Sequence, residues 1–194
     1  MKVETAADAQ RSESGLSLVE LLLYVLLGLI VLSVAGGMLI NSIRTGSQVD
    51  RSTAAANTGQ LIMRSVQSGV RNATQVGLTS TSGTQLLSVT TTNGLNPVVL
   101  SCQAWYYTPT AGGSLYMRRT AATAPIPPPD STTLASWTLL GTGISTTGGQ
   151  VFTATAGLVT VSLNIDAATA SPLALTSPAS TLTLVTTGTP CFLP

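Results

Sequence analysis

The chain has 194 residues, enough for one globular domain of ordinary size together with an extended element. Charged residues make up 8% of it and the formal net charge is +1, so no electrostatic footprint for nucleic acid is evident. Apolar residues make up 44%, which is enough to bury a core. After residue 74, polarity comes mainly from serine and threonine, a composition typical of an extracytoplasmic, β-rich domain.

The residues that usually carry enzyme chemistry are scarce. The sequence has no histidine, which removes the commonest general base and the commonest metal ligand. It has no glycine-rich phosphate loop, and beyond the N-terminal third the only acids are Asp130 and Asp166. The sequence therefore predicts a protein that is not an enzyme, with no cofactor and no metal site.

Residues 21–43 form an uncharged, predominantly apolar run. As a helix, about 23 residues rising about 1.5 Å each would span about 35 Å, enough to cross a hydrocarbon core of about 30 Å. Because the run is apolar on every face, lipid or similar helices must surround it.

Three interpretations compete for this N-terminal region: a plain membrane anchor, a secretory signal peptide and a prepilin leader. A signal peptide would place its apolar region at 21–32 and its cleavage site after Ala35. A signal peptide would also carry a net positive charge in the residues before its apolar region. Residues 1–20 contain two basic residues, Lys2 and Arg11, but four acids, so they are net acidic and disfavour the signal peptide.

Glu20 immediately precedes the apolar run. Placing a carboxylate close to hydrocarbon costs free energy unless the carboxylate is paired, so an acid in this position indicates a functional role. The alternative is that Glu20 simply stays in the lipid headgroup layer.

Residues 15–22, with the sequence GLSLVELL, closely resemble the processing site of type IV pilins and type II secretion pseudopilins. The resemblance implies that a prepilin peptidase removes a leader, residues 1–15, by cutting after Gly15, and methylates the new N-terminus at Leu16. It gives Glu20 a role in assembly with other pilin subunits. It also implies a single-pass protein of the cytoplasmic membrane, held in lipid with its head outside, which then moves into a surface pilus.

The implied chemistry of assembly is a salt bridge between copies. Cleavage after Gly15 creates an α-amino group at Leu16, with a reference pKa near 8. Glu20 of one subunit can pair with that amine on a neighbour, and only the correct axial register satisfies both groups. The pair therefore specifies alignment more than it adds net stability.

The helix is expected to run from about Leu18 to about Asn72, with a transmembrane and assembly half at 16–43 and an amphipathic half at 44–75. Apolar residues at Leu61, Ile62, Val66 and Val70 predict the face that lies on the head. Gly36 and Gly37 indicate a bend, a locally melted region or close helix packing. Gly77 and the hydroxyl-rich stretch after it are expected to end the helix.

The remaining residues, 76–194, predict a β-rich head, and the whole chain an α+β protein: a long membrane-spanning helix packed on an antiparallel sheet, as in the pilin fold. Expected strands are 85–92, 98–108, 114–120, 135–140, 158–166 and 181–187, with a hairpin at 110–113. Alternation is clearest in 158–166, where valine, leucine and isoleucine alternate with polar residues.

Cys102 and Cys191 are too few for a four-ligand zinc site without histidine. In an exported domain they form one disulfide; otherwise they are two free buried thiols. A disulfide would close a loop of roughly 90 residues, worth roughly 4 kcal/mol in the chain-entropy account, and would fasten the C-terminal tail to a strand.

Several head segments, 104–107, 113–119 and 137–140, together with 41–45 after the apolar run, are similar to W-type minor pilins and J-type minor pseudopilins. This resemblance implies a minor, tip-associated subunit that helps to initiate a filament. The alternative is a membrane-anchored or secreted β-domain protein unrelated to pili, cleaved after Ala35 or not at all.

Overall fold

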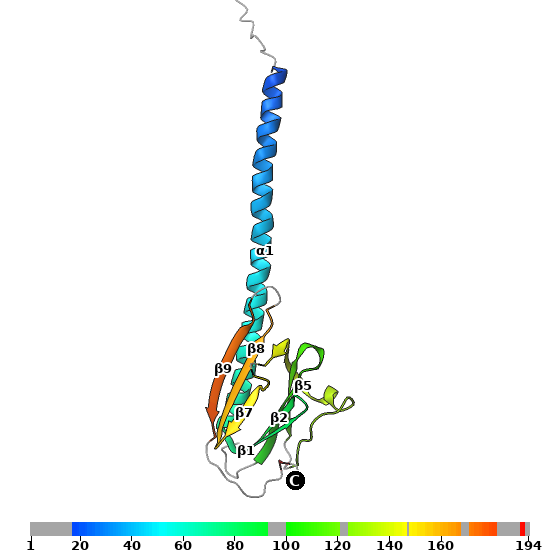
Figure 1. Ribbon diagram of the computed structural model, residues 1–194, viewed down its shortest axis with the longest axis vertical. Coiled ribbons are helices and arrows are strands. Elements are labelled where there is room, and N and C mark those ends of the chain that lie inside the picture. The colour runs from blue at the N-terminus through cyan, green and yellow to red at the C-terminus, as the bar shows by residue number, and fades with distance from the viewer. Residues whose placement is uncertain are drawn as a thin grey trace, which may run out of the picture. The chain divides into compact units, whose positions relative to one another are not determined.

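The computed structural model describes residues 17–92, 100–120, 124–146, 148–167, 171–181 and 191–192. Within these ranges the chain forms one long α-helix and two antiparallel β-sheets, the α+β architecture that the sequence predicts (Figure 1). The chain divides into two compact units, Met1–Gly46 and Ser47–Pro194.

Helix α1 spans Leu18–Arg71, 54 residues, close to its predicted bounds. It remains helical through Gly36 and Gly37, which excludes the locally melted region from the three alternatives. At its end the side-chain amide of Asn72 donates a hydrogen bond to the Ser68 carbonyl at 2.9 Å, so asparagine caps the last turn. The acid in the first turn, Glu20, and the base in the last turn, Arg71, suit the helix dipole.

The expected boundary at 75, with Gly77 as the helix breaker, is wrong. Residues Ala73–Thr81 form strand β1, and Gly77 lies inside it. The reason is long-range: β1 pairs antiparallel with β2, Thr84–Thr92, and this pairing extends almost to the residue that caps the helix. The turn between the two strands holds Ser82 and Gly83 at φ 49° and 83°, the left-handed conformation of a two-residue hairpin.

The first sheet is a five-stranded meander in the order β1-β2-β3-β4-β5, with β3 at Leu100–Thr108, β4 at Ser114–Thr120 and β5 at Thr138–Thr142. The strands expected near β2, β3 and β4 are confirmed, as is the hairpin at 110–113. The strand expected at 135–140 begins later than predicted, because Leu134–Ser136 forms a short 3₁₀ turn.

The second sheet consists of β6, Ile144–Ser145, β7, Phe152–Thr155, β8, Leu158–Ile165, and β9, Leu173–Ser180. Strand β8 confirms the clearest alternating pattern and pairs with the other three. The sequence analysis did not find β6, β7 or β9. Of the strand expected at 181–187, Thr181 is not in a strand and the rest lies outside the described residues.

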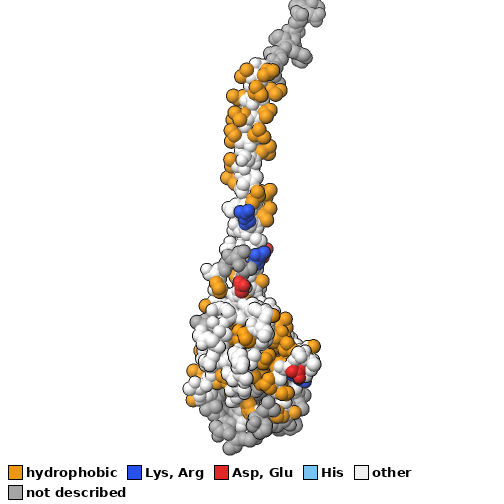
Figure 2. Space-filling view, turned by 45° about the vertical axis from the view of Figure 1, so that its right-hand side comes forward, with side chains coloured by type: hydrophobic (Ala, Val, Ile, Leu, Met, Phe, Trp, Pro, Cys, Tyr) orange, Lys and Arg blue, Asp and Glu red, His pale blue; other side chains and the backbone are white. Residues whose placement is uncertain are grey.

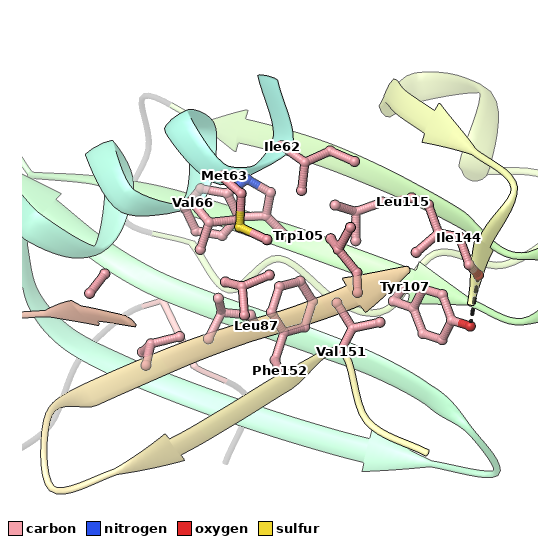
Figure 3. Packing of buried hydrophobic residues seen from close by; sticks show 14 of the residues in the cluster. Ile62, Met63, Val66, Leu87, Trp105, Tyr107, Leu115, Ile144, Val151 and Phe152 are labelled. Atoms are coloured by element: carbon pink, nitrogen blue, oxygen red, sulfur yellow. Dashed lines mark hydrogen bonds between the residues drawn. The ribbon is translucent and has the colours of Figure 1, made fainter. Parts of the chain in front are cut away.

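The second half of α1 packs against both sheets (Figures 1 and 3). In Figure 3, Ile62, Met63 and Val66 of the helix lie over Trp105 of β3, with Phe152 of β7 in the same core. The buried helix residues are Ala55, Gly59, Ile62, Met63, Val66, Gly69 and Val70. The predicted inward face is therefore confirmed at three of its positions, but Leu61 is 53% exposed.

A smaller core lies on the opposite face of the first sheet and contains a disulfide between Cys102 of β3 and Cys191. Both cysteines are buried, and Ile126 and Trp137 pack beside them. The disulfide alternative is thus confirmed over two free thiols. It fastens the C-terminal part of the chain to the central strand of the first sheet.

Candidate functional site

The N-terminal half of α1 carries a continuous apolar surface. Every Leu, Val, Ile, Met and Tyr side chain between residues 18 and 43 keeps at least 50% of its surface exposed. Figure 2 shows hydrophobic side chains along this part of the helix. Glu20 and Arg44 bound the uncharged stretch. So much apolar surface in water is strongly unfavourable, so the segment needs lipid or other apolar helices around it.

Among the described residues, α1 is the one helix long enough and apolar enough to cross a membrane. Signal sequences near an N-terminus and buried core helices share that length and composition. Its apolar window is not buried within the chain, which distinguishes it from a core helix. A membrane span is therefore compatible with the helix as it stands.

Glu20 lies in the first turn of α1 and is exposed. Its Oε1 atom accepts a hydrogen bond from the Tyr24 hydroxyl at 2.9 Å, one helical turn further on. Gly15 and Leu16, the predicted cleavage and methylation positions, lie outside the described residues. The sequence analysis missed Tyr24, although the i, i+4 spacing of a hydrogen-bonding pair on a helix could have revealed it.

The glycines of the apolar segment are open to approach. A Cβ atom added to Gly28, Gly36 or Gly37 would meet nothing within 4 Å. Their backbone is therefore accessible to another helix, as glycines at close helix–helix contacts in membranes require.

The two acidic residues described in the head, Asp130 and Asp166, take part in hydrogen bonds that stabilise the fold. The carboxylate of Asp130 accepts hydrogen bonds from the backbone and side chains of Thr132 and Thr133 at 2.7–2.9 Å. These bonds, led by that from the Thr132 side chain, lower the pKa of Asp130 to about 2. Asp166 follows β8, and its backbone N–H donates to the Gly143 carbonyl at 2.8 Å. The bonds of Asp130 hold a turn, and the bond of Asp166 continues the pairing of β8 with β6.

Two further kinds of site find no support in the head. Arg118 and Arg119 of β4 lie opposite Ala104 and Gln103 of β3, so strand alternation places them on opposite faces and they form no joint anion site. In the described part of the chain, no three His, Cys, Asp or Glu residues are grouped as they would be to hold a metal.

Two depressions lie on the described part of the head. One, of about 350 Å³, lies over β1 and β2 beside Ile126 and Phe192, and the other, of about 280 Å³, lies between β1 and the β7–β8 hairpin. Neither is lined by an acid, a base or a free thiol among the residues that the structure describes. The apolar segment with Glu20 and Tyr24 is therefore the candidate site with the most distinctive chemistry.

No protein-family model matches the chain, and neither does any curated protein or solved structure.

Proposed function

We propose that the chain is a subunit of a type IV pilus or a related filament. The observation that carries this proposal is the position of the GLSLVE motif: its glutamate, Glu20, lies in the first turn of a helix whose large apolar side chains over residues 18–43 are all exposed. A prepilin peptidase cuts after Gly15 and methylates Leu16. The apolar segment is held in lipid until the filament provides other helices to cover it.

Assembly uses the charge at the edge of that segment. The Leu16 amine made by cleavage pairs with Glu20 of a neighbouring subunit. Each charge would otherwise be desolvated without a partner, so a slipped register is penalised by several kcal/mol, on the order of the cost of breaking a buried pair. Open glycines such as Gly36 let neighbouring helices approach closely.

The head supports an exported location. Its disulfide between Cys102 and Cys191 is the kind of bond that persists in oxidising compartments outside the cytoplasm. Between residues 55 and 70, the same helix packs into the core of the head. The first part of the helix is thus surrounded by lipid or by other subunits, and its last part belongs to the folded head.

The subunit is proposed to be a minor, tip-associated one. The head segments that resemble minor pilins, 104–107, 113–119 and 137–140, lie in or beside β3, β4 and β5, which are neighbours in the first sheet. The three segments are therefore neighbours in the folded head, although they are separated in the sequence. A minor subunit should be present at few copies per filament, which quantitative mass spectrometry of sheared filaments can count.

The first test is the N-terminus of the mature protein, determined by mass spectrometry of protein from its native membrane. The proposal expects N-methylated Leu16. A mature protein that begins at Gly36 would indicate a secreted β-domain, and one that begins at Met1 would indicate a plain anchor. Either result would remove the filament proposal.

The second test replaces Glu20. Glu20→Ala should leave membrane insertion unchanged and abolish recovery in sheared filaments, because the neighbour's amine loses its partner. Asp50→Ala is the matched control, since it removes an exposed acid from the same helix beyond the apolar segment. Normal recovery of Glu20→Ala in filaments would exclude this mechanism of assembly.

A further inference from the structure

We infer that Tyr24 is a positioning residue for Glu20: its hydroxyl holds the carboxylate at the membrane edge and orients it toward the amine of the next subunit. This inference rests on the proposed function. It assigns a role to a residue outside the processing motif.

The geometry brings the two groups together within one helical turn. The Tyr24 hydroxyl oxygen is 2.9 Å from Oε1 of Glu20, a normal hydrogen-bond distance. Side chains on an α-helix lean toward its N-terminus, so a tyrosine at i+4 extends its hydroxyl back over the turn that carries Glu20. The ring can stay against hydrocarbon while the hydroxyl reaches the polar edge, the arrangement that favours tyrosine at membrane interfaces.

Tyr24 is also chemically alone in this part of the helix. Between residues 21 and 32 it is the one side chain with a hydrogen-bonding group. The other positions on the same helix face within two turns of Glu20 toward the membrane centre carry only hydrocarbon: Leu23 at i+3 and Leu27 at i+7. Before assembly, Tyr24 is therefore the side chain within this stretch that can partner the carboxylate.

The bond leaves room for the amine. A carboxylate has about four acceptor sites on its two oxygens, so one hydroxyl does not saturate it. Because the hydroxyl holds one conformation of Glu20, less side-chain freedom is lost when the neighbour's amine arrives. Tyr24 thus preorganises the contact that sets the register of the filament.

The experiment is Tyr24→Phe in the full chain, which removes one oxygen and retains the ring. Cleavage after Gly15 and membrane insertion should match the wild type. Incorporation into filaments, in competition with wild-type protein, should fall about tenfold, equivalent to about 1.4 kcal/mol. Wild-type incorporation of Tyr24→Phe would overturn the inference.

A spectroscopic readout tests the bond without assembly. The infrared carboxyl band of Glu20 in protein in lipid vesicles is assigned by its loss in Glu20→Gln. The Tyr24→Phe variant should shift this band, and an unchanged band would contradict the inference. If Glu20→Ala blocks assembly while Tyr24→Phe has no effect, the inference alone fails. If Glu20→Ala assembles normally, the proposed function fails as well.

Discussion

At the scale of single residues, two glycines decide how closely α1 approaches the sheets. A Cβ atom on Gly69 would lie 2.2 Å from the Trp105 ring, and one on Gly59 would lie 2.1 Å from a methyl group of Leu175 in β9. Glycine lowers helix propensity by about 1 kcal/mol relative to alanine. Close packing of these larger side chains against the helix backbone offsets that cost.

Gly69→Ala should therefore lower the free energy of unfolding by about 1–3 kcal/mol, because the buried Trp105 ring must move. Gly46→Ala is the matched control, since it lies in the same helix and its added Cβ would meet nothing within 4 Å. Urea unfolding of both variants in detergent measures the difference. Equal stabilities would contradict the packing argument.

Asp130 makes a pH-dependent contribution to its turn. Its pKa of about 2 in the folded protein is below the ordinary value of 3.8, so the carboxylate favours the folded state while it is ionised in both states. The contribution should be complete above about pH 4 and should disappear as the pH falls through about 2.

The measurement compares wild type with Asp130→Asn by urea unfolding across that pH range. The stability difference should shrink on acidification, because the protonated carboxyl group of Asp130 and the amide that replaces it in the variant are nearly equivalent acceptors. A difference that stays constant between about pH 5 and about pH 2 would argue against the turn as the origin of the shift.

At the scale of elements, one buried amide links the two sheets. The Gln85 side chain in β2 accepts hydrogen bonds from the backbone N–H groups of Val151 and Phe152 at 2.6 and 2.9 Å. Its amide nitrogen donates to the Phe152 carbonyl at 3.0 Å and to the Ser80 hydroxyl at 3.2 Å. Gln85 thus replaces a strand–strand pairing at the start of β7.

Gln85→Leu should lower the free energy of unfolding by about 3 kcal/mol or more, because each buried backbone group left without a partner costs about 1–3 kcal/mol. Gln67→Leu is a suitable control, since the half-buried amide of Gln67 bonds one hydroxyl, that of Ser177. Its effect should remain below about 1 kcal/mol. Comparable losses in chemical unfolding would refute the linking role.

At the scale of the whole molecule, the two compact units differ in how they bury apolar surface. All the buried residues of α1 lie between Ala55 and Val70, within Ser47–Pro194. The unit Met1–Gly46 has no buried residue among those described. The core of the head is therefore complete without the apolar segment.

A fragment of residues 47–194 should fold as a soluble, disulfide-bonded domain with one cooperative unfolding transition. A fragment of residues 72–194 should not, because the loss of Ile62, Val66 and Val70 uncovers the main core. Circular dichroism and thermal unfolding of the two fragments compare them. A cooperative 72–194, or an unfolded 47–194, would show that the core is divided differently.

The sequence by itself determined the features that depend on local pattern. The uncharged run predicted α1, alternation predicted β8, and the glycine-rich 110–113 segment predicted a hairpin, because periodicity and turn chemistry act within a few residues. Glu20 was found in the same way, by its place beside the apolar run, and so was the inward position of Ile62, but not the outward position of Leu61 one residue away.

Only the tertiary structure decided the features whose partners are distant in sequence. The bonds of Gln85 to Val151 and Phe152 span 66 and 67 residues. The sequence offered the disulfide between Cys102 and Cys191 as one of two alternatives, and the structure chose between them across 89 residues. Strand β1 is a strand because β2 pairs with it, although the sequence analysis expected Gly77, which lies inside β1, to end the helix. Such contacts form only when the folded chain brings the partners together, so no local pattern encodes them.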